Sequence, residues 1–364
     1  MDEIPIVIDN GSSITKAGLS GFFHPSLICP TIIGYTKYKK SLRTDISNYN
    51  IYIGREADSK RSILDIKYPI ENGTVNNWDD MTKIWEYVFT RLNTESKNKK
   101  VLLTEPVLNP IKNKEKIIET MFEHFNISST FIAIQGILSL YGNGKTTGIV
   151  LDIGHNITQT IPVYDGYSIK HAVNRINLAG DNITEYLQRL LELSGYRFTT
   201  STEKEIVRKI KEKYSYYILD NKTESDNKFT YVLPDGNKIN LSNETYKSSE
   251  ILFNPRLIGK DIDGIHTMLY NSILKTDIDI RRPLFSNIVL SGGTTMINNF
   301  DNRLSNELSK LTNISIDVIP SEDRIYTTWI GGSILCNLPT FNSSWITRNE
   351  YNEYGNSIIH RKSM

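Results

Sequence analysis

The sequence has little cysteine, almost no net charge and no long apolar run. Its only two cysteines in 364 residues are Cys29 and Cys336. They show neither the spacing of metal ligands nor the density of a secreted disulfide framework, so we expect two buried thiols. No apolar stretch approaches the roughly 20 residues that a helix needs to span a bilayer. These shortages argue against a disulfide-stabilised domain and against a transmembrane protein.

Charge is balanced, with 42 basic against 41 acidic residues and a net charge of +1. The chain therefore lacks the electrostatic footprint of a nucleic-acid binder. Its first residues, Met1 to Pro5, carry acid where a secretory leader carries base, which predicts a cytoplasmic protein without direct membrane or nucleic-acid contacts. A hydrophobic fraction of 39% and a charged fraction of 23% are typical of globular proteins. The length favours two domains.

One sequence motif occurs twice in the chain and suggests how its domains are arranged. The segment Ile6-Val-Ile-Asp9-Asn-Gly11-Ser-Ser-Ile14-Thr15 returns as Ile149-Val-Leu-Asp152-Ile-Gly154-His-Asn-Ile157-Thr158. Both copies read Asp-x-Gly-x-x-Ile-Thr after an apolar β-branched run, which predicts a strand, a tight turn and a second strand. A repeat at this wide spacing indicates a duplicated domain rather than a solenoid. We expect the boundary between the two copies just before Gly148.

The rest of the chain alternates between helical and strand patterns, which predicts α/β lobes with partly parallel sheets. Helical spacing of apolar residues predicts helices over 78–93, 113–125, 180–193 and 202–218. Apolar runs predict strands over 101–104 and 288–291, and Pro234-Asp-Gly236 predicts a hairpin over 229–241. Gly331-Gly332, like Gly292-Gly293, is interpreted as a glycine pair at the end of a strand, ahead of a helix. Residues 35–50 are basic and polar and predict an exposed loop.

The repeated glycine turns suggest a phosphate site. A tight glycine turn can aim several backbone N–H groups into one concavity, and two such turns facing each other would clamp a polyphosphate from both sides. Asp9 and Asp152 end the first strand of each copy, where they could hold Mg²⁺ through its waters, and Lys16 could contact the phosphates. A single Asp-x-Gly turn is common after any strand, but the duplication is not. These residues indicate a duplicated phosphotransferase or ATPase, with sugar kinases and heat-shock chaperones left open.

At these same residues the sequence resembles the actin family, and the resemblance extends over nearly the whole chain. The segments on which the resemblance rests include Lys67-Tyr-Pro-Ile-Glu71, Asn77-Trp-Asp-Asp-Met81, Lys145-Thr-Thr-Gly148 and Trp329-Ile-Gly-Gly-Ser-Ile-Leu335. It implies the duplicated actin-type ATPase fold, an α/β fold with two ribonuclease H-like lobes and a nucleotide cleft between them. It places a first lobe at 1–147 and 327–364, with subdomain 2 at about 31–67. The second lobe then covers 148–326, with subdomain 4 at about 179–258.

The resemblance also implies the cofactors, ATP or ADP with Mg²⁺, and the residues that hold them. Asp9 and Asp152 would bind the metal, and Gln135, Asp152 and Gln159 would act in catalysis. The residues expected to bind the nucleotide are Ser12, Ser13, Ile14, Lys16, Gly154, His155, Asn156, Gly180, Lys211, Glu212, Gly292, Gly293 and Met296.

Several positions depart from the actin pattern. His155 and Asn156 stand where actin has an acid and then a glycine, and Gln159 stands where actin has a histidine near the attacking water. Ile325 replaces a basic residue on the adenine side, and Ser13 replaces a glycine. We therefore expect nucleotide binding with weakened hydrolysis, a weak ATPase at most.

The resemblance predicts an actin-like cytoskeletal protein of the cytoplasm that forms or joins an actin-type filament. The alternative is a non-polymerising actin-related subunit of a larger complex, dynactin-like or chromatin-remodelling-like, that uses its nucleotide structurally. The 35–50 loop and Asn72 depart from actin, which weakens the expectation of self-assembly. Expected partners are further copies, other actin-family subunits, and actin-binding proteins at a cleft formed by Tyr141, Gly144, Thr146, Gly166, Tyr167, Leu335 and Thr340.

Overall fold

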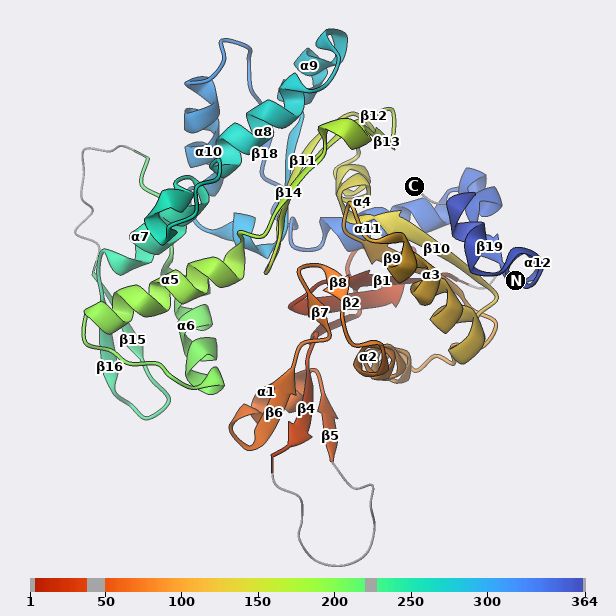
Figure 1. The fold of residues 1–364 in the computed structure, drawn as a ribbon, viewed down its shortest axis with the longest axis horizontal. Helices are drawn as coiled ribbons and strands as arrows, with labels where there is room; N and C mark the ends of the chain where they lie inside the picture. The colour runs from red at the N-terminus through yellow and green to blue at the C-terminus, as the bar shows by residue number, and fades with distance from the viewer. Residues whose placement is uncertain (1–3, 38–49, 220–227, 363–364) are drawn as a thin grey trace, which may run out of the picture. The chain divides into compact units, whose positions relative to one another are not determined.

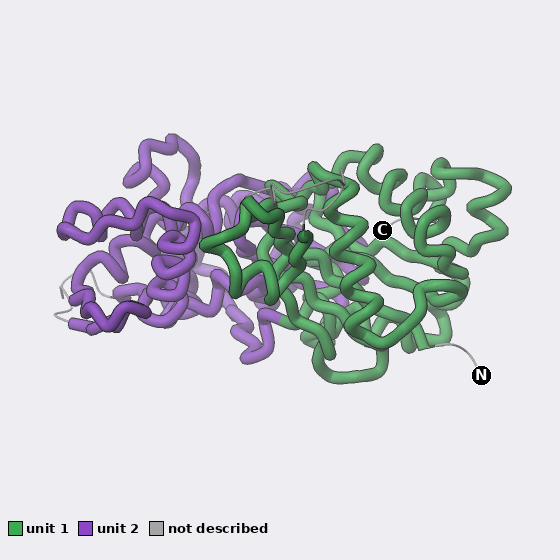
Figure 2. The backbone as a smooth tube through the Cα atoms, turned by 90° about the horizontal axis from the view of Figure 1, so that it is seen from below, with its two compact units in different colours: residues 1–145, 326–364 green, residues 146–325 purple. Residues whose placement is uncertain are grey.

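The chain forms two compact units. A computed structural model describes residues 4–37, 50–219 and 228–362, so most of the predicted 35–50 loop lies outside the described residues. Unit 1 comprises residues 1–145 and 326–364, and unit 2 comprises residues 146–325 (Figure 2). Unit 1 is therefore discontinuous in sequence, whereas unit 2 is a single stretch of chain.

The centre of unit 1 is a six-stranded sheet in the order β19-β10-β9-β1-β2-β3 (Figure 1). Its strands are β1 (Ile6–Asn10), β2 (Ile14–Leu19), β3 (Leu27–Pro30), β9 (Lys100–Glu105), β10 (Ser129–Ile134) and β19 (Ile346–Thr347). β1 pairs antiparallel with β2 and parallel with β9. The predicted hairpin at the first copy of the repeat is thus confirmed, and so is the strand predicted at 101–104.

Helices cover both faces of this sheet. They are α2 (Trp78–Arg91), α3 (Ile111–Glu119), α4 (Gln135–Gly142), α11 (Thr327–Asn337) and α12 (Arg348–Tyr354). Successive residues of a strand point to opposite faces of the sheet, so the side chains of β1 alternate between its two faces. Ile6 and Ile8 pack with residues of α2, α3 and α12, whereas Val7 packs with α4 and α11. α2 begins where predicted, because the Asn77 side chain accepts a hydrogen bond from the Asp80 N–H and so caps the helix.

Smaller elements complete unit 1. They are β4 (Ile33–Thr36), β5 (Ile51–Ile53), α1 (Arg55–Ser59), β6 (Leu64–Lys67), β7 (Ile70–Glu71) and β8 (Thr74–Val75), with 3-10 turns at Arg61–Ile63, Pro339–Ser344 and Gly355–His360. The helix predicted over 113–125 begins two residues earlier, at Ile111. Its second part is not α-helical, because α3 continues into a π-helical turn at Thr120–His124. Cys29 and Cys336 are both buried free thiols, as predicted, and burial raises the pKa of Cys29 to about 11.

The prediction for Gly331-Gly332 was wrong. These glycines lie inside α11 rather than at the end of a strand, and α11 packs against α4. A β-carbon on Gly331 would lie 1.8 Å from the carbonyl oxygen of Leu138, and one on Gly142 would lie 2.4 Å from that of Thr327. The two helix backbones therefore touch, and glycine is required by the closeness of this contact rather than by a turn.

Unit 2 repeats the strand arrangement of unit 1. Its sheet has the order β13-β12-β11-β17-β18, with β14 also paired to β12. The strands are β11 (Gly148–Ile153), β12 (Thr158–Tyr164), β13 (Tyr167–Ser168), β14 (Asn174–Ile176), β17 (Ile288–Ser291) and β18 (Val318–Ile319). β11 is antiparallel to β12 and parallel to β17, as β1 is to β2 and β9. This shared pairing is what a domain duplication produces.

The helices of unit 2 pack on this sheet and beside it. They are α5 (Gly180–Leu193), α6 (Ser201–Tyr214), α7 (Glu244–Ser249), α8 (Ile265–Leu274), α9 (Ile278–Phe285) and α10 (Phe300–Ser309). A hairpin of β15 (Phe229–Val232) and β16 (Lys238–Leu241) lies next to α5 and α6. The remaining 3-10 turns are Lys170–Ala172, Glu250–Leu252, Pro255–Ile258 and Gly293–Met296. α5 has the predicted bounds, whereas the helix predicted over 202–218 ends at Tyr214.

Candidate functional site

The turn between β1 and β2 consists of Gly11, Ser12 and Ser13, and Ile14 begins the second strand. A β-carbon on Gly11 would lie 2.4 Å from the carbonyl oxygen of Ile14, so only glycine fits this turn. Thr31, the residue after β3, contacts this turn through two hydrogen bonds. Its hydroxyl donates to the Gly11 carbonyl at 2.7 Å, and its N–H donates to the Ser13 carbonyl at 2.9 Å. Two hydrogen bonds thus tie the turn to the residue that follows β3.

A polar cluster surrounds the carboxylate of Asp9, which is only 2% exposed. The ammonium of Lys16 lies 2.8 Å from Oδ2, and the Thr104 hydroxyl donates to Oδ1 at 2.7 Å. Gln135, the first residue of α4, donates from its amide nitrogen to the same Oδ1 at 3.1 Å and to the Asn10 carbonyl at 3.3 Å. The structure therefore brings two further predicted site residues, Lys16 and Gln135, to the carboxylate of Asp9.

The corresponding turn of unit 2 is formed by Gly154, His155 and Asn156, between β11 and β12. The Gly154 carbonyl accepts the Thr294 hydroxyl at 2.7 Å and the Gly180 N–H at 3.2 Å. These bonds fasten the turn to the start of α5 and to the segment after β17. Three separate parts of unit 2 thus meet at this turn, two of them through the predicted site residues Gly154 and Gly180.

Asp152 lies directly opposite Gln159 in the β11–β12 ladder, and the Gln159 amide donates to its Oδ2 at 3.2 Å. Gly292, at the end of β17, adopts a left-handed φ of 88°. A β-carbon there would lie 2.9 Å from Oδ1 of Asp152 and 2.3 Å from the Ile153 carbonyl, so glycine is required. The Gln159 amide thus contacts Oδ2 of Asp152, and Gly292, which has no side chain, lies next to Oδ1.

Two basic residues of this region have lowered pKa values. Burial lowers the pKa of His155 to about 4, although nearby Asp181 partly opposes the shift. Its Nε2 lies 3.9 Å from Oδ1 of Asp181. Burial also lowers the pKa of Lys211 to about 8, and its ammonium donates to the Gly180 carbonyl at 2.7 Å. His155 is therefore neutral at physiological pH, which makes it a hydrogen-bonding group rather than a charge.

The remaining predicted nucleotide residues lie around the glycine pair after β17. Gly293 begins the 3-10 turn that ends at Met296, and a β-carbon on Gly293 would meet no atom within 4 Å. Open space therefore adjoins Gly293. Glu212, by contrast, lies on the surface of α6, where its carboxylate accepts a hydrogen bond from Arg208 at 2.9 Å.

Two site residues were missed by the sequence reasoning. Thr104 donates to Asp9, and Thr294 donates to Gly154. Their partners lie 95 and 140 residues away in sequence, so no local motif signals these contacts. For Thr104, the only available hint was its place as the last residue of the strand predicted over 101–104.

The residues predicted to form a partner cleft come from both units, and each is described within its own unit. In unit 1, Leu335 of α11 is only 6% exposed and packs in the core beside Leu138, so it can contribute only to the floor of such a surface. In unit 2, Tyr167 of β13 is 81% exposed, and the Gly166 N–H donates to the Thr146 carbonyl at 2.8 Å. Tyr167 is thus available for contact with a partner.

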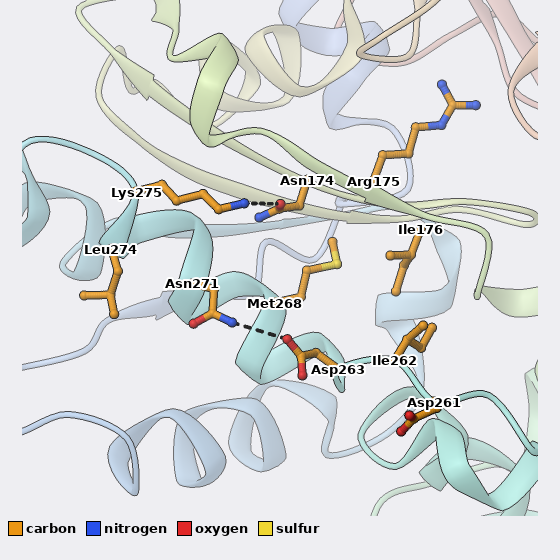
Figure 3. A pocket seen from close by; sticks show the side chains of 10 residues that line it. All are labelled: Asn174, Arg175, Ile176, Asp261, Ile262, Asp263, Met268, Asn271, Leu274 and Lys275. Atoms are coloured by element: carbon orange, nitrogen blue, oxygen red, sulfur yellow. Dashed lines mark hydrogen bonds between the residues drawn. The ribbon is translucent and has the colours of Figure 1, made fainter.

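A pocket of about 660 Å³ lies within unit 2, between β14 and α8 (Figure 3). Met268 and Ile176 face its interior, and Lys275 bridges one end by donating to the Asn174 side chain at 3.0 Å. None of the predicted nucleotide residues lines it. It is separate from the turns described above.

The family model described as Actin matches residues 1–364. The chain belongs to the actin family. The predicted α/β fold of duplicated actin type is thereby confirmed. Membership also gives the two glycine hairpins a context, because actin-family proteins generally bind an adenine nucleotide with a divalent metal.

The residues present fit such a ligand in each unit of this actin-family chain. Each hairpin turn lies beside an acid and is only half-buried, and open space adjoins Gly293. Over residues 4–37, 50–219 and 228–362, no three His, Cys, Asp or Glu side chains gather as a metal site. Mg²⁺ keeps several waters and binds through one or two carboxylates plus phosphate oxygens, so single acids such as Asp9 and Asp152 suit it. Within the same ranges, no helix combines the length and apolar character needed to cross a membrane.

Proposed function

We propose that the chain binds ATP together with Mg²⁺ and that both glycine hairpins contribute to the binding. Asp9 and Asp152 bind the metal through its waters, and Lys16 contacts the phosphates. Backbone of the two turns, with Ser12, Ser13 and His155, holds the phosphate oxygens. Gly180, Lys211, Gly292, Gly293 and Met296 adjoin the nucleoside.

The observation that carries this proposal is the cluster around Asp9. Removing a carboxylate and an ammonium from water costs several kcal/mol per ion, and their attraction repays this only with good geometry. An apolar pair in the middle of a strand ladder would serve the fold as well. A buried acid held by Lys16, Thr104 and Gln135 beside a glycine turn is therefore better explained by a bound cation and phosphate.

The test is binding of the fluorescent analogue etheno-ATP in the presence of Mg²⁺, with release of bound nucleotide on denaturation as a second readout. Asp152→Asn should weaken binding at least tenfold, because it removes the charge that faces the metal. Asp165→Asn is the matched control, since Asp165 lies beyond the far end of β12, and it should bind as the unaltered chain does. A chain that neither binds etheno-ATP nor releases nucleotide does not have this function.

We further propose that the protein forms or joins an actin-type filament in the cytoplasm and hydrolyses ATP slowly. Family membership supports assembly with further copies or with other actin-family subunits. Sedimentation of the purified chain with Mg-ATP tests this, alone and after residues 38–49, which follow β4, are replaced by a Gly/Ser linker of equal length. Pelleting that the replacement abolishes supports the filament. A chain that never pellets, and that co-purifies in a fixed complex, would instead be a non-polymerising subunit.

A further inference from the structure

The pocket between β14 and α8 in unit 2 carries opposite charges at its two ends (Figure 3). Asp261 and Asp263 lie at one end, and Lys275 lies at the other end beside Asn174. The volume of about 660 Å³ falls within the roughly 300–1,000 Å³ that is usual for ligand pockets. The pocket is therefore large enough for a ligand, and its charge changes sign along its length.

At each end, one charged side chain is bonded to a neutral group of the chain. The Asp263 carboxylate accepts a hydrogen bond from the Asn271 amide at 3.3 Å, and the Lys275 ammonium donates to the Asn174 side chain at 3.0 Å. Within the part of the chain that the structure describes, neither Asp263 nor Lys275 takes part in an ion pair. A ligand with a charge at each end can thus pair with both side chains without separating an existing ion pair.

Between the two ends the pocket is apolar, and one of its walls is an edge strand. Ile176 of β14 and Met268 of α8 face its interior (Figure 3). β14 pairs with β12, and over residues 4–37, 50–219 and 228–362 no other strand pairs with it. An edge strand presents unpaired N–H and C=O groups, to which an extended peptide can add as a further strand. This wall therefore suits an extended peptide.

The position of the charges sets the length of such a peptide. Asp263 lies two residues before α8 and Lys275 directly follows it, so the two flank a helix of 10 residues. A helix of that length is about 15 Å long. An extended chain rises about 3.3 Å per residue, so about five residues cover this distance. The first, third and fifth side chains of such a segment point the same way, because the period of a strand is two.

We propose that this pocket binds an extended segment of a partner protein in which a basic and an acidic side chain flank an apolar one. The basic side chain pairs with Asp263, the apolar side chain packs against Met268 and Ile176, and the acidic side chain pairs with Lys275. The full charges of these pairs outweigh the half charges at the two ends of α8, so they set the direction of the segment. Binding does not require Mg-ATP, since no predicted nucleotide residue lines the pocket.

Asp263 and Lys275 also have a role that needs no ligand. An acid before a helix and a base after it complement the helix dipole, so both side chains favour α8 itself. Removing either one for this reason alone would weaken every peptide equally or none at all. The experiment therefore compares peptides that differ in one charge.

The probe is the fluorescein-labelled peptide Lys-Thr-Ile-Thr-Glu with both termini blocked, and fluorescence anisotropy measures its binding to the full chain. We expect a Kd below about 0.5 mM. Replacing the lysine or the glutamate of the peptide by methionine should weaken binding about three- to fivefold, because each change removes one exposed ion pair. Replacing the isoleucine by serine should weaken it about tenfold, since the apolar contact is lost.

Variants of the chain assign each end of the peptide. Asp263→Asn should weaken binding of the lysine peptide about three- to fivefold and leave binding of the peptide with methionine in place of lysine unchanged. Lys275→Met should have the same effect on the acidic end. Asp279→Asn is the matched control, because Asp279 is an exposed acid of α9 that does not line the pocket. It should bind all peptides as the unaltered chain does.

The proposal is overturned if the unaltered chain does not bind the lysine peptide at concentrations up to about 0.5 mM. It is also overturned if the lysine and methionine peptides bind equally, or if Asp263→Asn weakens both to the same extent. If Asp263→Asn does not fold, the comparison of peptides on the unaltered chain decides. Self-association of the chain that the peptide displaces, measured by analytical ultracentrifugation, would make a second copy the occupant and contradict a separate partner.

Discussion

Lys16 and Asp9 face each other across the β1–β2 ladder with their charged atoms 2.8 Å apart, in a part of unit 1 where Asp9 is almost fully enclosed. Lys16→Met would leave the enclosed carboxylate without its charged donor. We expect the free energy of unfolding to fall by about 3 kcal/mol in nucleotide-free protein, because removing one partner of a buried pair strands the other charge. Lys116→Met is the control, since Lys116 is much more exposed in its pair with Glu119 of the same unit, and it should cost less than about 1 kcal/mol.

Tryptophan fluorescence in a urea titration is a suitable measurement for unit 1. All four tryptophans of the chain lie in that unit, at Trp78, Trp85, Trp329 and Trp345. The transition they report is therefore that of unit 1, even if the two units unfold separately. Equal midpoints for Lys16→Met and Lys116→Met would show that the Asp9 pair does not stabilise the fold.

The glycine contact between α4 and α11 predicts a second effect on unit 1. Gly331→Ala should destabilise it by about 2 kcal/mol, because the new methyl group would meet the Leu138 carbonyl at 1.8 Å and backbone cannot move aside cheaply. Alanine's better helix propensity, about 1 kcal/mol, opposes this loss but is smaller. Ile334→Ala, on the exposed side of the same helix, should change the urea midpoint little. A midpoint for Gly331→Ala at or above that of the parent would contradict the contact.

The buried imidazole of His155 predicts a pH dependence. Its pKa is lowered to about 4 in the folded chain, against about 6.5 when unfolded. The unfolded chain therefore takes up the proton first as pH falls, so the stabilisation is complete above pH 6.5 and is lost progressively between pH 6.5 and 4. From pH 7 to pH 5 the loss attributable to His155 should be about 2 kcal/mol.

Urea unfolding followed by circular dichroism at these two pH values measures that loss, with His155→Gln as the control that lacks the titrating group. The parent should lose about 2 kcal/mol more than the variant on acidification. An NMR titration of the imidazole gives a second readout, and a midpoint near 6.5 in the folded protein would contradict the burial.

ATP turnover should be slow, since phosphoryl transfer depends on positioning and electrostatics at the attacking water. Gln135 donates to Asp9 and Gln159 donates to Asp152, so the amide nitrogen of each is already bonded to a carboxylate. Combining Gln159→His with His155→Asp should accelerate single-turnover phosphate release on the order of a hundredfold. If the unaltered chain already releases phosphate as fast as this double variant, the idea of weakened hydrolysis fails.

Local patterns in the sequence predicted much of the fold. The repeat Asp-x-Gly-x-x-Ile-Thr predicted both hairpins, because a strand, a glycine turn and a second strand are specified by neighbouring residues. Helical spacing predicted the bounds of α5 for the same reason. The predicted helix over 202–218 failed at its end because Ser215 turns extended and Tyr217 is drawn into the core of unit 2. Tertiary burial overrode local periodicity there.

The contacts of the candidate site were harder to foresee. The types of residue were visible in the sequence, but Thr104 and Thr294 are joined to their partners only by the folded chain. Gly331 was misread because a glycine needed for a helix contact looks the same in sequence as one needed for a turn. Close approach between distant segments leaves no local signal.

The split of unit 1 across the two ends of the sequence has a consequence for how the chain matures on the ribosome. Val7, Leu102 and Leu138 emerge early, but their packing partner Trp329, whose indole donates to the Val7 carbonyl at 3.1 Å, emerges after all of unit 2. Unit 2 is continuous and can collapse during synthesis. One apolar face of the first-made sheet therefore stays exposed to water until the last segment is synthesised, and exposed apolar surface of this kind favours aggregation of the nascent chain.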